Sequence, residues 1–126
     1  MLLSELHIDA CDALVFIGGN GARDYWSHPR VHNVVRSMHE HGRLLAAICI
    51  APVIFARAGI LKGRQASCHP SARRDLESAG AQYMLAPVHV DDTLVTASGP
   101  TAAREFAEAI VTSLAPSLRP QTPVTV

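Results

Sequence analysis

The sequence predicts an α/β fold in which a mostly parallel sheet lies between two layers of helices. Short apolar segments alternate along the chain with segments of helical periodicity, which is the pattern of such folds. The segments Ala13–Ile17 and Leu44–Ile48 are apolar at every position, as is typical of strands covered on both faces. Glycine or proline stands at most boundaries between the segments, where the chain has to turn.

The length of the chain predicts one domain. Its 126 residues can build one core and are too few for two, and 48% hydrophobic with 17% charged residues is typical of a globular chain. We expect a single domain over residues 1–114 and a loosely ordered, proline-rich tail over residues 115–126.

The composition also limits which kinds of molecule the protein is expected to bind. Eleven acidic and eleven basic residues give no net charge and no long run of one sign, so neither nucleic acid nor an anionic membrane is an expected partner. No apolar stretch approaches the roughly 18 residues that span a bilayer, and the N-terminus lacks the basic region of a secretory signal. The cysteines, Cys11, Cys49 and Cys68, form no C-x-x-C pattern, which favours a reduced, cytoplasmic protein.

The first half of the chain predicts two strands, each followed by a helix. The strand Ala13–Ile17 ends in the turn Gly18–Gly21, and a helix follows with Ser27 near its cap, Pro29 in its first turn and Gly42 at its end. The strand Leu44–Ile48 then turns through Cys49 into a short helix that Gly59 closes.

The second half continues the alternation. The expected elements are a strand at 65–68, a helix at 71–79, a hairpin of strands at 88–90 and 94–97, and a last helix after residue 101. The turn of the hairpin is Asp91-Asp92. We find no internal repeat.

Cys49 is the strongest candidate for a reactive residue. It lies between a buried strand and a helix, where a nucleophile sits on a sharp turn at the carboxyl edge of the sheet. Free backbone N–H groups and the positive end of the helix dipole at that point stabilise a thiolate. The alternative is a small buried apolar residue, as free cysteines often are.

The turn Gly18–Gly21 follows a neighbouring strand and therefore lies on the same edge as Cys49. Its N–H groups could bind a developing oxyanion, or its glycines could serve only the turn itself. Tyr25 and Trp26, just beyond, fit a core or an interface better than a surface that stacks on substrate.

His69 follows the third predicted strand, and two interpretations stand for it. It is either a base or orienting partner for a thiol, or a loop histidine that caps a turn. Its neighbour Cys68 is either an inert strand residue or a resolving thiol. The histidines form no ligand pattern with the cysteines, so we expect no metal site and no cofactor.

These features together resemble the ThiJ/PfpI family, in its deglycase-like branch within the class I glutamine amidotransferase-like superfamily. The likeness extends from Asp12 to Leu114 and rests on the runs at 12–21, 44–52, 58–64, 69–70, 79–81 and 94–100. It implies a three-layer, flavodoxin-like sandwich.

The resemblance also implies roles for individual residues. Cys49 corresponds to the nucleophile on the elbow, and the backbone amides of Gly18, Gly19 and Ile50 to the donors around it. His69 corresponds to a histidine near the sulfur. Several members carry a histidine directly after the cysteine, whereas this chain has Ile50, which argues against a peptidase.

The start of the chain departs from the family pattern. Members have a further strand–helix–strand portion that supplies a glutamate to the sulfur, and Met1–Asp12 does not match it. The chain is therefore expected to be an N-terminally truncated form of the fold, with an unpaired edge at Ala13–Ile17. It should be poorly stable alone or form a homo-oligomer, such as a homodimer.

The resemblance implies a cofactor-independent, glyoxalase- or deglycase-like enzyme, or a hydrolase, acting on small carbonyl compounds through Cys49. Two alternatives stand beside it. Cys49 could serve a redox or stress-response protein, or a chaperone, without turnover. The chain could also be a catalytically incomplete fragment.

Overall fold

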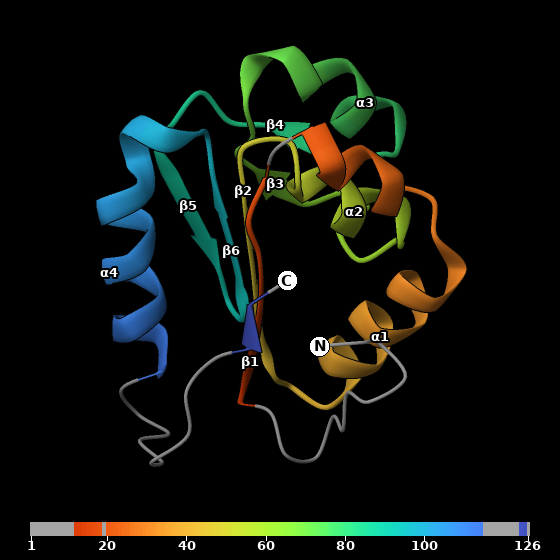
Figure 1. Ribbon diagram of the computed structural model, residues 1–126, viewed down its shortest axis with the longest axis horizontal. Coiled ribbons are helices and arrows are strands. Elements are labelled where there is room, and N and C mark those ends of the chain that lie inside the picture. Colours follow the sequence, from red (N-terminus) through yellow and green to blue (C-terminus); the bar gives the residue numbers. More distant parts are fainter. Residues whose placement is uncertain (1–11, 19, 115–123, 126) are drawn as a thin grey trace.

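The computed structural model describes residues 12–18, 20–114 and 124–125, and its centre is a five-stranded sheet (Figure 1). The strand order is β5-β6-β2-β1-β7, with bounds Val88–Asp91, Leu94–Ala97, Leu44–Ile48, Ala13–Phe16 and Val124–Thr125. Every neighbouring pair is parallel except the hairpin of β5 and β6. The predicted mostly parallel sheet is therefore confirmed.

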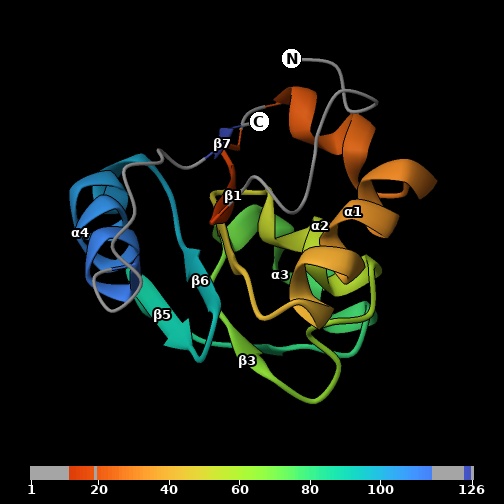
Figure 2. The ribbon, with the colours of Figure 1, turned by 90° about the horizontal axis from the view of Figure 1, so that it is seen from below.

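Helices cover both faces of this sheet (Figure 2). Helix α4 (Ala103–Leu114) lies on one face, against β2, β5 and β6. Helices α1 (Pro29–Glu40) and α2 (Pro52–Arg57) lie on the other, and α3 (Arg73–Ser78) packs against α2. The three-layer arrangement is thus also as predicted. No helix in the described part of the chain has the length and apolarity needed to cross a bilayer.

The apolar strands are buried because the sheet has a core on each face. In β1, Leu14 and Phe16 belong to the core beneath α1 and α2, whereas Ala13 and Val15 belong to the core beneath α4. Every residue of β1, β2 and β6 is buried. These strands are therefore apolar at every position because both of their faces are buried, as the sequence indicated.

The N-cap of α1 is His28, the residue next to Ser27, so Ser27 stands near the cap as expected. Nδ1 of His28 accepts a hydrogen bond from the Arg30 amide at 3.2 Å. The hydroxyl of Ser27 instead accepts from Arg57 Nη1 at 2.7 Å. At the other end Gly42 follows the cap with φ of 69°, as expected of a helix stop.

The predicted strand at 65–68 is wrong in its extent. Only Gln65–Ala66 form a strand, β3, which pairs in parallel with β4 (Gln82–Tyr83) in a separate two-stranded sheet. Ser67 leaves the ladder because its amide donates to the side-chain oxygen of Thr96 at 2.9 Å. A side chain of β6 thereby takes the place of a strand partner.

The edge of β1 is partly paired. Strand β7 runs parallel to β1, with Leu14 opposite Val124 and Val15 opposite Thr125. The expectation of a loosely ordered tail falls on residues 115–126, of which 115–123 and 126 lie outside the described residues. The expectation of a wholly unpaired edge is wrong, since β7 pairs with half of β1.

Candidate active site

Cys49 occupies a strained turn between β2 and α2. Its φ of 68° lies in the left-handed region, which residues other than glycine rarely adopt and which costs about 1–3 kcal/mol. Its amide donates to the carbonyl oxygen of Ala97, at the end of β6, at 3.0 Å. The neighbouring strand therefore helps to hold the strained residue at the carboxyl edge of the sheet, which is the geometry of a nucleophile elbow.

Gly18, at the end of β1, packs directly against this elbow. A Cβ at position 18 would lie 2.6 Å from the Cβ of Cys49, closer still to the carbonyl oxygen of Ile48, and 3.0 Å from the Ile50 nitrogen. These atoms belong to the backbone of the elbow or are fixed to it, so they cannot move aside. Position 18 therefore requires glycine because of this close approach.

We expect Gly18→Ala to destabilise the fold by about 1–3 kcal/mol, because the new methyl group forces the elbow away from β1. Urea unfolding measures the loss. The matched control is Gly99→Ala, since a Cβ there meets only Cδ2 of His69 at 3.5 Å, an ordinary contact. Equal stability of the two variants would contradict this account of Gly18.

The peptide group between Cys49 and Ile50 has a defined orientation. The carbonyl oxygen of Cys49 accepts a hydrogen bond from the His69 amide at 2.7 Å. A trans peptide group holds its N–H opposite its carbonyl, so the Ile50 N–H points away from His69. That N–H makes no hydrogen bond to any residue the structure describes, and it is available to an oxyanion. Gly19, also predicted as a donor, lies outside the described residues.

Trp26 supports the same turn from a distant part of the chain. Its indole N–H donates to the Ile50 carbonyl oxygen at 3.0 Å, and its ring is buried. The guanidinium groups of Arg23 and Arg57 lie over the ring, 4.7 and 5.1 Å from its centroid. Sequence reasoning placed Trp26 in a core or an interface and missed this hydrogen bond to the residue after Cys49.

Replacing Trp26 by Phe should slow alkylation of Cys49 and destabilise the fold by about 1–3 kcal/mol, since the Ile50 carbonyl loses a buried donor. Iodoacetamide kinetics at Cys49 and urea unfolding measure the two effects. Arg23→Gln is the control, because it removes one stacked cation and keeps the indole donor. If both variants react at the wild-type rate, Trp26 does not position the elbow.

The side chain of His69 is held by a neighbouring turn. Nδ1 accepts from the Ser71 amide at 3.2 Å and lies 2.8 Å from the Ser71 hydroxyl oxygen. An amide can only donate, so Nδ1 is an acceptor and the neutral ring carries its proton on Nε2. Among the described residues, no hydrogen bond joins the ring to Cys49. His69 therefore caps a turn with its ring and contacts the elbow through its backbone amide, and its role as a base or orienting partner for the thiol stays a prediction.

Two cavities flank the elbow. One, of about 570 Å³, is lined by Cys49, by the end of β1 and by α4. The other, of about 440 Å³, is lined by His69 together with Tyr83 and Leu85. Pro100 lines both cavities. Cys49 and His69 thus line two different cavities that share Pro100.

Cys68 is buried beside the elbow and differs from Cys49 in character. Its side chain is fully buried, and Sγ donates to the carbonyl oxygen of His69 at 3.3 Å. Burial raises the pKa of the Cys68 thiol from 9.0 to about 12, with smaller contributions from Cys49 and from the carboxylates of Asp75 and Glu77. Cys68 is therefore a protonated thiol at neutral pH, which favours the inert interpretation over a resolving thiol.

The raised pKa of Cys68 predicts a loss of stability in alkaline solution. Between pH 9 and 12 the unfolded chain has lost this proton while the folded chain still holds it, so a rise in pH favours unfolding. From pH 8 to pH 10 the contribution is about 1.4 kcal/mol. Urea unfolding at both pH values should show this extra loss in the wild type and not in Cys68→Ala; equal losses would contradict it.

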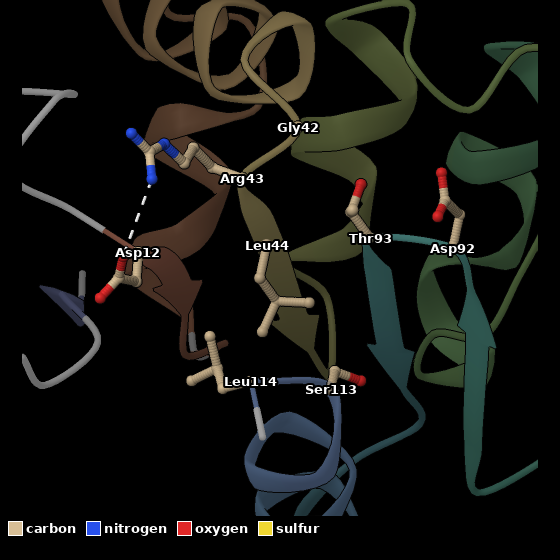
Figure 3. Close-up of a pocket in the computed structure, with 8 residues that line it drawn as sticks. All are labelled: Asp12, Gly42, Arg43, Leu44, Asp92, Thr93, Ser113 and Leu114. Carbon is tan, nitrogen blue, oxygen red and sulfur yellow. Dashed lines mark ion pairs between the residues drawn. The ribbon is translucent and has the colours of Figure 1, made fainter. Parts of the chain in front are cut away.

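A third cavity, of about 160 Å³, lies at the opposite end of the sheet, where β1, β2 and β6 begin (Figure 3). Arg43 Nη1 reaches Asp12 Oδ1 at 3.7 Å along its wall. None of the described residues that line it is a cysteine or a histidine. Among the described residues, no group of three or more histidine, cysteine or acidic side chains is placed to hold a metal ion. The candidate chemistry therefore lies at the carboxyl edge.

The fold and the elbow first define a class, that of three-layer α/β proteins with a cysteine on a strand–turn–helix junction. The chain belongs to the DJ-1/PfpI family, whose sequence profile matches residues 1–113. The resemblance to the ThiJ/PfpI family seen in the sequence is thereby confirmed.

Curated relatives span several kingdoms. An uncharacterized protein of Methanocaldococcus jannaschii is 37% identical over 105 residues, which cover 81% of this chain and 51% of that protein. A deglycase of Thermococcus kodakarensis is 33% identical, over 79% of this chain and 60% of that protein. A glutathione-independent glyoxalase of Caenorhabditis elegans is 29% identical, over 89% and 60%. The chain thus spans about half to three fifths of the length of these relatives.

Solved structures agree with this assignment. A ThiJ/PfpI domain protein from Brachyspira murdochii has a TM-score of 0.89 and 32% identity, over 94% of this chain and 68% of that one. DJ-1beta of Drosophila melanogaster has a TM-score of 0.77 and 32% identity, over 90% and 59%. The topology described above is therefore that of this family.

Proposed function

We propose that the chain carries a cofactor-independent glyoxalase- or deglycase-like activity on small reactive carbonyl compounds, with Cys49 as nucleophile. The observation that carries the proposal is the strained conformation of Cys49 beside the Ile50 amide, which makes no hydrogen bond to any residue that the structure describes. Backbone strain at a reactive residue is typical of functional sites. The names of relatives, a deglycase and a glyoxalase among them, support the substrate class.

The reaction on a 2-oxoaldehyde needs only water. The sulfur of Cys49 adds to the aldehyde carbon, and the carbonyl electron pair moves to oxygen, where the Ile50 amide stabilises the charge. Protonation gives a hemithioacetal. The proton of the former aldehyde carbon then moves to the neighbouring carbonyl carbon, and the hydroxyl proton on the first carbon moves to the oxygen of the second, which gives a thioester of a 2-hydroxy acid. Water then cleaves the carbon–sulfur bond and restores the thiol.

His69 takes part as a proton donor in this proposal. Its Nδ1 accepts from the Ser71 amide, so the proton available for transfer is the one on Nε2. Pro100 lines both the cavity of His69 and the cavity of Cys49, so we assign the proton transfer between the two residues to water.

Replacing Cys49 by Ser should lower kcat/KM for methylglyoxal at least about 10³-fold, because a serine hydroxyl is a far weaker nucleophile without an adjacent base. Production of lactate measures turnover, and circular dichroism checks the fold. Cys68→Ala is the matched control and should keep the wild-type rate.

Turnover that survives in Cys49→Ser would discard the mechanism. If the protein is instead a redox protein, the wild type should turn over no carbonyl compound. Dilute peroxide should then add oxygen at Cys49, which intact mass measures.

A further inference from the structure

The cavity at Cys49 is apolar on every side that the structure describes. Val15, Ile17 and Ile48 line it together with α4, and none of its described lining residues carries a charge. Its volume of about 570 Å³ falls within the range of about 300–1,000 Å³ that is typical of small-molecule sites. A cavity that served methylglyoxal alone would not need this size or this lining.

Helix α4 lines the cavity with apolar residues only. Phe106 and Ile110 are buried against the sheet and also line the cavity. Ala103, Ala107 and Val111 follow one another at a spacing of four residues, are exposed, and line it as well. Val111 has 68% of its surface exposed, and Ile17, just after β1, has 59%. Exposed apolar side chains from α4 and from the end of β1 thus line the same cavity as Cys49.

The position of the sulfur decides what kind of group this is. Cys49 lines the same cavity as the exposed stripe of α4, so a molecule whose carbonyl carbon meets the sulfur extends its substituent along α4. The Ile50 amide, which makes no hydrogen bond to a described residue, directly follows Cys49 in the chain, whereas none of the described lining residues of the cavity carries a charge. The arrangement thus has a polar reacting end and an apolar extension.

We propose that the site prefers carbonyl compounds with an apolar substituent of several carbon atoms, such as long-chain alkyl 2-oxoaldehydes, over methylglyoxal and over charged glycated compounds. The proposal rests on the proposed function for its chemistry, and the bond changes are those of the 2-oxoaldehyde reaction above. What it adds is the part of the substrate that does not react. Each methylene group removed from water by the cavity should raise kcat/KM about threefold to fourfold.

The first experiment measures turnover of 2-oxoaldehydes whose alkyl chains have one, three and six carbon atoms. We expect kcat/KM to rise with chain length, and Val111→Asp to flatten the rise because it places a charge in the cavity. Thr112→Asp is the matched control, since Thr112 is exposed next to Val111 and does not line the cavity. It should keep the wild-type dependence.

The second experiment separates this proposal from the catalytic one. N-Alkylmaleimides of the same chain lengths alkylate Cys49 without turnover, and peptide mapping reports the rate at that residue, with the urea-unfolded chain as reference. A rise with chain length in the folded wild type, lost in Val111→Asp, supports the apolar site even if no carbonyl is turned over. Rates independent of chain length overturn it, even if methylglyoxal is a substrate.

Sedimentation velocity tests the remaining alternative, in which a second copy of the chain covers the cavity. Self-association of the wild type that Val111→Asp abolishes and Thr112→Asp retains would overturn the substrate proposal. A sedimentation coefficient that is the same for all three chains supports it.

Discussion

The hydrogen bonds that hold Cys49 at positive φ are the constraint on which the site depends. The residue donates its amide to β6 and accepts at its carbonyl from the His69 amide, so both of its peptide groups are anchored to other segments. A left-handed conformation that costs about 1–3 kcal/mol persists only where such contacts over-determine it. The sulfur and the Ile50 amide keep their positions because the backbone around them has few alternatives.

Segments far apart in the chain cooperate in this anchoring. Gly18 approaches the elbow from the end of β1, Trp26 from the loop that follows, His69 from beyond β3, and Ala97 from β6. Each contributes a backbone contact or a single hydrogen bond, which alone is worth about 1 kcal/mol. The elbow is thus supported by the fold as a whole, because all these segments meet only when the sheet is complete.

The sequence could predict what depends on local pattern. The continuous apolarity of β1 and β2 and the turn at Cys49 each follow from residues close together in the chain. The hydrogen bond from Trp26 to Ile50 joins residues 24 positions apart, and no periodic pattern in the sequence indicates it. The hydrogen bond from the Ser67 amide to the Thr96 side chain, which ends β3 early, joins residues 29 positions apart.

A local pattern also leaves open which of two neighbouring side chains caps a helix. His28 caps α1, whereas the neighbouring Ser27 hydroxyl accepts a hydrogen bond from Arg57, although serine is the commoner N-cap residue. The pairing of β7 with β1 was missed for a different reason. Two residues, Val124 and Thr125, are too short a run to show alternation or continuous apolarity.

The direction of β7 has a practical consequence for handling the protein. Because β7 runs parallel to β1, a chain that leaves it at Thr125 heads toward the carboxyl edge, on the side where Cys49 lies. A fluorophore attached at Thr125 would therefore lie beside Val15, in the strand next to the one that leads to Gly18 and the elbow, and would report on this side of the sheet.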